Sequence, residues 1–220
     1  MGKRRLEDAI KQIDHPIEVT YRCFELDPTL GKDIKENIYE ALAKKYGMSE
    51  AQARANTQNM VQMAKEAGLD YQMDTLILTN TFDAHRLTMY ANTQGLMTEM
   101  TERILRAYFT ESKHIGDHET LTELAVEVGL DREAVANMLA SDEMSEAVRT
   151  DERLAQQYGI RSVPFYLINK KYSLTGAQPT STFVQALKQV IAEDEIKPLK
   201  PLNSDDGMSC DDDGCEIPKK

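Results

Sequence analysis

The sequence of 220 residues contains no tryptophan, only three cysteines and no apolar run long enough to cross a membrane. A bilayer-spanning helix needs about 20 consecutive apolar residues, and the residues after Met1 lack the apolar core of a signal peptide. Three cysteines are too few, and odd in number, for the disulfide framework of a small secreted protein. We therefore expect a cytoplasmic protein whose cysteines serve reactions rather than structural cross-links.

Acidic side chains outnumber basic ones. The chain has 37 Asp and Glu but only 26 Lys and Arg, which gives a formal net charge of −11. Nucleic acids and anionic membrane surfaces are bound through clusters of Lys and Arg. We therefore expect neither a nucleic-acid partner nor a membrane partner. The 41% of hydrophobic and 29% of charged residues are typical of a folded globular chain.

The first 30 residues predict a helix followed by a strand. Apolar residues recur at helical spacing over residues 1–14, and Pro16 ends that pattern because the residue before a proline avoids helical geometry. The segment from Ile17 to Cys23 then alternates apolar and polar residues. This period of two predicts a strand with one buried face.

The middle of the chain, from about residue 33 to 158, predicts a succession of helices. Ser49 and Gln52 form a capping-box pattern at the start of one helix. Asp117 and Asp131 stand where two further helices would begin, and an aspartate is a favourable N-cap. The local start and stop signals therefore divide this region into several helices.

After Gly159 the pattern changes to that of β-structure. Residues 163–169 form a short apolar run with a proline near its start, which predicts a buried strand. Residues 172–176 predict the returning strand of a hairpin, and Thr180 is the expected N-cap of a last helix. Beyond Glu195 the chain becomes rich in Pro, Ser and Asp.

Several short segments along the chain share motifs with one known family. They are Gly2–Glu7, Tyr21–Pro28, Asn80–Leu87, Gly159–Phe165, Leu174–Pro179 and the pair Cys210 and Cys215. In these segments the chain resembles thiol-disulfide oxidoreductases of the DsbA type, in particular their FrnE-like branch. The segments occur in the family's order and extend over nearly the whole chain.

The resemblance implies an α/β fold of the thioredoxin type with a large all-helical insertion. Residues 1–30 and 159–195 would form the thioredoxin-like core, residues 31–158 the helical insertion, and residues 196–220 an acidic tail. In the family a central first strand and a Cys-x-x-Cys pair precede the first helix, so we expect both to be missing here. Bare strand edges would then be exposed. Either Met1 is an internal residue of a longer chain, or another segment fills the gap.

The resemblance also implies a substrate-binding site at Val163 and Pro164, with a cis peptide bond that turns the Val163 backbone toward the substrate. The residues alone would favour trans, because only about 5–6% of X-Pro bonds are cis. His85 is a further substrate-binding candidate, since it could face the site as a proton donor. The alternative is that His85 is a packed or capping side chain.

The remaining candidates are cysteines. The resemblance makes Cys210 and Cys215 an auxiliary catalytic redox pair, and Gly214 supplies flexibility for closing a disulfide loop. The aspartates between the two thiols raise their pKa and slow them as nucleophiles, so an unreactive acidic tail is the alternative. We expect no metal site, since two thiolates fall short of the four ligands of structural zinc. Cys23, on the strand pattern, is predicted to be buried and inert.

The expected function is thiol-disulfide exchange of the oxidoreductase or isomerase type, without a bound cofactor and impaired without the Cys-x-x-Cys. Partners would be proteins that carry thiols or disulfides, with glutathione as a further candidate, and a homodimer is left open. One alternative is a glutathione-dependent enzyme similar to 2-hydroxychromene-2-carboxylate isomerase, which would carry serine in place of the first cysteine. The other is a non-catalytic protein that binds peptides or metal.

Overall fold

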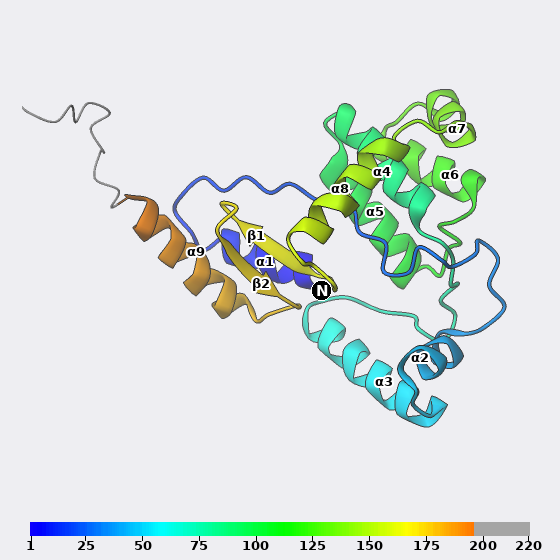
Figure 1. Ribbon diagram of the computed structural model, residues 1–220, viewed down its shortest axis with the longest axis horizontal. Coiled ribbons are helices and arrows are strands. Elements are labelled where there is room, and N and C mark those ends of the chain that lie inside the picture. The colour runs from blue at the N-terminus through cyan, green and yellow to red at the C-terminus, as the bar shows by residue number, and fades with distance from the viewer. Residues whose placement is uncertain (196–220) are drawn as a thin grey trace, which may run out of the picture.

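The computed structural model describes residues 1–195 of the chain, so the predicted tail with Cys210 and Cys215 lies outside the described residues. Figure 1 shows a small hairpin with two helices on one side of the molecule and a group of helices on the other. The helices are α1 (Gly2–Ile10), α2 (Ile38–Tyr46), α3 (Glu50–Glu66), α4 (Phe82–Thr93), α5 (Met97–Phe109), α6 (His118–Val128), α7 (Arg132–Ala140), α8 (Ser145–Gln157) and α9 (Thr180–Glu195). The strands are β1 (Phe165–Ile168) and β2 (Tyr172–Thr175).

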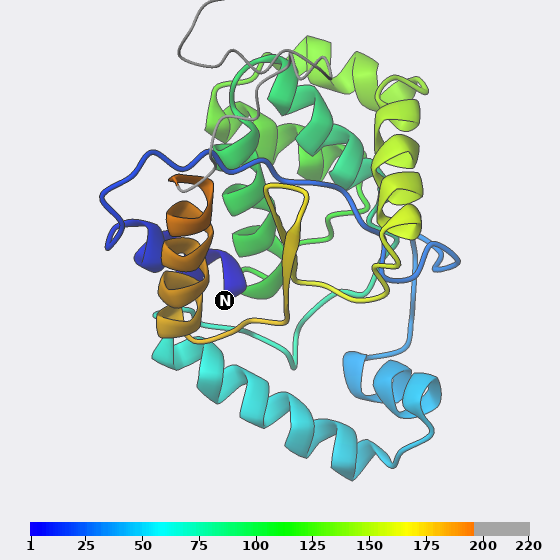
Figure 2. The ribbon, with the colours of Figure 1, turned by 60° about the vertical axis from the view of Figure 1, so that its left-hand side comes forward.

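The hairpin and two helices form one hydrophobic core. Strands β1 and β2 pair antiparallel, with Phe165 opposite Thr175 and Ile168 opposite Tyr172. Helices α1 and α9 pack beside each other on this hairpin, as Figure 2 shows. Phe183 of α9 lies at the centre of this core, almost fully buried and edge-on to the ring of a β1 tyrosine. Burying an aromatic ring in this way stabilises the packing of α9.

The prediction of a strand from Ile17 to Cys23 is wrong. The segment is extended but is assigned no strand, and no backbone hydrogen bond joins residues 17–22 to another part of the described chain. A strand needs a neighbouring strand to pair its backbone groups, and within residues 1–195 none lies alongside this segment. Its attachment comes instead from side chains, since the Cys23 backbone N–H donates to Asp151 Oδ2 at 2.9 Å.

The first helix is shorter than the predicted 1–14 range. Regular helix ends at Ile10, after which the backbone N–H groups of Gln12 and Ile13 bond to carbonyls three residues back. This tighter hydrogen-bonding pattern is common in the last turn of a helix. The difference therefore concerns only how the helix ends.

The helical region has its own core. Helices α4 to α7 enclose a cluster that includes Leu87, Met100, Leu121 and Met138. The α2–α3 hairpin packs separately, on a loop whose apolar residues include Met73. None of the helices in residues 1–195 is long and apolar enough to cross a membrane.

The predicted caps of α3, α6 and α7 are confirmed, whereas Thr180, the expected N-cap of the last helix, is the first residue of α9 itself. The Ser49 hydroxyl accepts the backbone N–H of Gln52, and the Gln52 side-chain oxygen accepts the backbone N–H of Ser49. Both halves of the capping box are therefore present. Asp117 and Asp131 each accept a backbone N–H in the first turn of the helix that they precede. These bonds satisfy donors that the helix itself leaves free.

Candidate functional site

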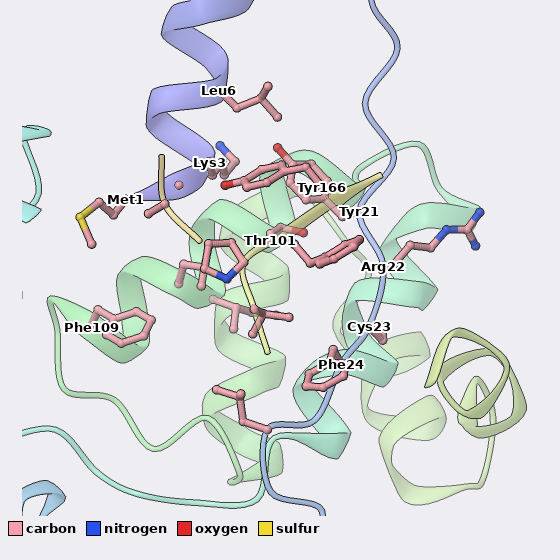
Figure 3. A pocket seen from close by; sticks show the side chains of 18 of the residues that line it. Met1, Lys3, Leu6, Tyr21, Arg22, Cys23, Phe24, Thr101, Phe109 and Tyr166 are labelled. Atoms are coloured by element: carbon pink, nitrogen blue, oxygen red, sulfur yellow. The ribbon is translucent and has the colours of Figure 1, made fainter. Parts of the chain in front are cut away.

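A large cleft lies where the hairpin core meets the helical region. Its volume is about 2460 Å³, and its lining includes the start of α1, residues 15–24, β1 and parts of α5. Figure 3 shows Leu6, Tyr21, Phe24 and Phe109 among the side chains that line it. The walls are therefore mostly apolar, as expected for a site that binds an apolar chain segment or a small molecule.

The Val163–Pro164 peptide bond is cis and lies on the wall of this cleft. The Val163 side chain is 41% exposed, and the Pro164 carbonyl is fixed by the backbone N–H of Gly176 at 2.8 Å. Pro164 also lies against the first turn of α1, because a Cβ added at Gly2 would be 3.1 Å from its Cγ. The predicted pair is thus accessible from the cleft, and its role in binding substrate stays a prediction.

The basic start of α1 is held by an acidic residue of α5. Lys3 Nζ lies 2.6 Å from one carboxylate oxygen of Glu102, and an Arg4 amino group lies 2.9 Å from the other. Burial by itself would lower the pKa of Lys3, but the hydrogen bonds to Glu102 and Glu7 raise it. Lys3 and Arg4 are therefore not free solvated charges, and they tie α1 to the helical region.

Two tyrosines face the same part of the cleft. Figure 3 shows the rings of Tyr21 and Tyr166 next to each other, close to Lys3. The hydroxyl of Tyr166 is buried and has no hydrogen-bond partner among the described residues. Burial raises the pKa of Tyr166 to about 12. The sequence reasoning did not single out Tyr166, Tyr21 or Glu102, because only the packing of distant segments brings them to α1.

His85 lines the cleft as well, but it is packed against the extended segment. The neighbouring Phe24 backbone acts on the pKa of its ring, and the His85 carbonyl oxygen lies 3.8 Å from Cys23 Sγ. Burial lowers the pKa of His85, which favours its neutral form. These contacts fit the packed alternative, and substrate binding by His85 stays a prediction.

Cys23 is 2% exposed, as the sequence predicts. Burial, and next to it the charge of Asp151, raises the pKa of the Cys23 thiol to about 12. The thiolate is the reactive form of cysteine. Cys23 is therefore unsuited to disulfide exchange in the folded protein.

Comparison with known proteins decides the family. The model of the family described as DSBA-like thioredoxin domain matches residues 1–188. The chain belongs to this DSBA-like family. Its fold is accordingly a thioredoxin-like fold with a helical insertion, and membership supports a function of the thiol-disulfide oxidoreductase type.

The chain is also similar to relatives and solved structures from several organisms. A probable DsbA oxidoreductase from Streptomyces coelicolor is 38% identical, with a TM-score of 0.85, over 99% of this chain and 93% of that one. The Bacillus subtilis protein YwbO is 26% identical over 190 residues, which are 85% of this chain and 88% of that protein. The cytosolic disulfide reductase DsbM from Pseudomonas aeruginosa, solved with GSH, is 16% identical over 87% of this chain and 92% of that one, with a TM-score of 0.55. At that identity DsbM supports the fold alone.

Proposed function

We propose that this DSBA-like chain is a cytoplasmic thiol-disulfide oxidoreductase of the FrnE-like branch, and that its reactive Cys-x-x-Cys stands on a segment before α1. The observation that carries the proposal is the contact between the first turn of α1 and Pro164. It places the start of the helix directly against an exposed, cis-proline-containing loop. A thiol just ahead of Gly2 would therefore share the cleft with Val163.

The start of α1 suits a reactive thiol. The free N–H groups and the dipole at a helix N-terminus stabilise a thiolate and lower the pKa of the thiol. The thiolate would attack a substrate disulfide, form a mixed disulfide and release one substrate thiolate. The second cysteine would then attack the mixed disulfide, which leaves the protein oxidised and the substrate reduced. The same steps in reverse would oxidise a substrate dithiol.

The cleft also has the walls that an additional strand needs. Residues 17–24 and residues 163–170 both line it, and among the described residues the backbone of 17–22 and the outer edge of β1 have no strand partner. An inserted strand could pair with both walls and satisfy these backbone groups. This supports a strand that leads into the Cys-x-x-Cys.

Protein thiols and disulfides are the proposed substrates, because membership of the DSBA-like family supports a function of the thiol-disulfide oxidoreductase type. Glutathione is the proposed small-thiol partner, and the structure of DsbM with GSH supports that choice only through a shared fold. We further propose that Cys210 and Cys215 exchange disulfides with the main pair as an auxiliary redox centre. Sequence spacing and family resemblance are the support for that role.

The test is reduction of insulin disulfides by dithiothreitol, followed by turbidity. We would compare this chain with a version extended by the residues that its reading frame encodes upstream of Met1. Each would also be made with Cys210→Ser and Cys215→Ser, and near-UV circular dichroism would check the fold. We expect the extended protein to accelerate insulin reduction, the chain from Met1 to do so weakly or not at all, and the tail variants to lose part of the rate.

Three results would contradict the proposal. The reading frame could encode no strand and Cys-x-x-Cys ahead of Met1. The extended, folded protein could leave the rate of insulin reduction unchanged. The chain from Met1 could be folded and fully active through its tail, in which case Cys210 and Cys215 form the primary centre and the proposed upstream pair is unnecessary.

A further inference from the structure

A buried glutamate joins the extended segment to helix α8. Glu25 is 7% exposed, and its carboxylate lies 2.7 Å from an amino group of Arg149. The same Arg149 nitrogen lies 2.6 Å from Glu152, one turn along α8. Asn80 donates to Glu25 at 3.3 Å. Two carboxyl groups therefore share one guanidinium nitrogen, and of the three side chains Glu25 is buried, Glu152 is 22% exposed and Arg149 is 43% exposed.

The charges around this point do not balance. The extended segment contributes Glu25 and Arg22, and α8 contributes Arg149, Asp151 and Glu152. Arg22 forms an ion pair with Asp151, with 3.0 Å between an Arg22 amino group and Asp151 Oδ1. Three carboxyl groups thus face two guanidinium groups. His85 of α4 adds no balancing charge, because burial lowers its pKa and favours its neutral form.

One oxygen in the group has no conventional partner. Glu152 Oε1 is buried and, among the described residues, no donor N–H or O–H reaches it. The Glu25 and Glu152 carboxyl groups are nevertheless neighbours, because they lie 2.7 Å and 2.6 Å from the same Arg149 nitrogen. A proton on one carboxyl group would bond to the other, and it would remove the excess negative charge at the same time. A shared proton would thus account for the charge imbalance.

We propose that Glu25 and Glu152 share a single proton in a bond between a carboxylic acid and a carboxylate, and that this bond holds the extended segment against α8. Burial, supported by the neighbouring Glu152, raises the pKa of Glu25. A carboxyl group whose pKa is raised by folding contributes stability at low pH, and that contribution is lost as the pH rises through the folded-state pKa. The contact of Glu25 with Glu152 and Arg149, called the joint below, therefore contributes most stability at acidic pH. Its contribution falls as the pH rises.

The joint affects the cleft because the same segment forms its wall. Tyr21, Cys23 and Phe24 all line the cleft and lie within four residues of Glu25. When the proton leaves, two carboxylates repel each other across one guanidinium group, and this wall loses part of its attachment to α8. The inference concerns the folded chain itself and holds whether or not the proposed redox function does.

The experiment is a pH titration of the chain labelled with ¹³C at the glutamate carboxyl carbons, followed by NMR from pH 4 to 9. We expect one resonance to titrate at a higher pH than those of the surface glutamates, because burial and a neighbouring carboxyl group both raise the pKa of a carboxyl group. It should be absent in Glu25→Gln and should move toward the surface values in Glu152→Gln. Glu146→Gln is the matched control, because Glu146 lies on the same helix but is exposed and pairs with Arg153.

Hydrogen exchange of the Cys23 amide gives a second readout, since this N–H is bonded to Asp151 next to the joint. Its protection factor should fall as the pH rises through the titration midpoint in the natural sequence and in Glu146→Gln, and stay constant in Glu152→Gln. The proposal is overturned if all glutamates titrate together. It is also overturned if the resonance that titrates at higher pH has the same midpoint in Glu152→Gln as in the natural sequence. Because the glutamine amide still accepts from Arg149 and donates to Glu25, a folded Glu152→Gln protein is expected even if Glu25→Gln fails to fold.

Discussion

Gly2 lies so close to Tyr166 that a Cβ atom at position 2 would overlap the tyrosine hydroxyl oxygen. The start of α1 is therefore docked against β1 through a position that only glycine fits. This contact, together with the Lys3–Glu102 ion pair, fixes the helix start relative to both the hairpin and the helical region.

We expect Gly2→Ala to lower the free energy of unfolding by about 1–3 kcal/mol, because an added methyl group in a close contact forces a shift of the packing. Adding Tyr166→Phe should recover most of the loss, and Tyr166→Phe alone should cost little, since within residues 1–195 the hydroxyl has no partner to lose. Urea unfolding measures these differences. Gly31→Ala is the control, because no atom of the described part of the chain lies within 4 Å of a Cβ at that position. Equal stabilities of Gly2→Ala and Gly31→Ala would contradict the close contact.

Arg86 should be among the most sensitive residues of the helical region. Its buried guanidinium group donates to the carbonyls of Met138, Ser141 and Glu143 and pairs with Asp83 at 2.9 Å. We expect Arg86→Met to cost about 3–5 kcal/mol, since it leaves a buried carboxylate without this partner and several carbonyls unsatisfied.

The comparison for Arg86→Met is Arg132→Met, measured by the same chemical unfolding. Arg132 forms an ion pair with Glu119 in which both side chains are more than half exposed, and such pairs contribute about 1 kcal/mol or less. If the two variants lose similar stability, Arg86 is not the structural centre that its contacts indicate.

Asp83 should make the stability of the protein depend on acidic pH. Burial alone would raise its pKa, but hydrogen bonds from Lys32, His118 and Arg86 outweigh burial and hold the pKa at about 2. Because the folded-state pKa lies below the unfolded value, this contribution is present above about pH 4 and is lost as the pH falls toward 2.

Urea midpoints between pH 2 and 7 test this dependence. The natural sequence should lose stability below about pH 4, whereas Asp83→Asn should be less stable at pH 7 and change less over the acidic range. Parallel curves for the two proteins would show that Asp83 does not contribute to the acid sensitivity.

Cys23 should resist alkylation in the folded protein. Its pKa of about 12 leaves little thiolate near neutral pH, and its side chain is buried. We expect iodoacetamide to modify Cys23 at least about 100-fold more slowly in buffer than in 8 M urea, with the site assigned by mass spectrometry. Similar rates in the two solvents would mean that the wall of the cleft opens readily at this residue.

Much of the architecture could be predicted from the sequence because its signals are local. The Ser49–Gln52 capping box and the Asp117 and Asp131 caps depend on residues three positions apart, and each marks a helix start correctly. The hairpin follows from a short apolar run, a turn and a returning strand. The cis bond at Val163–Pro164 agrees with the family resemblance rather than with the residue pattern.

Local pattern failed where the outcome depends on a distant partner. Ile17–Cys23 has the alternation of a strand, but a strand forms only when another strand pairs with its backbone, and the described residues place none there. His85 similarly lies on the cleft wall, yet its contacts with Phe24 and Cys23 could not be read from the helix that carries it.

The sequence by itself therefore determined the helices, the caps of α3, α6 and α7, and the hairpin, because hydrogen bonds between near neighbours and apolar periodicity set these features. The family followed from the resemblance of motifs along the chain. Only the tertiary structure decided that Gly2 meets Tyr166, that Lys3 meets Glu102, and that Glu25 shares Arg149 with Glu152. These pairs join segments far apart in the chain. Their burial and charge depend on how the cores pack, which no local pattern contains.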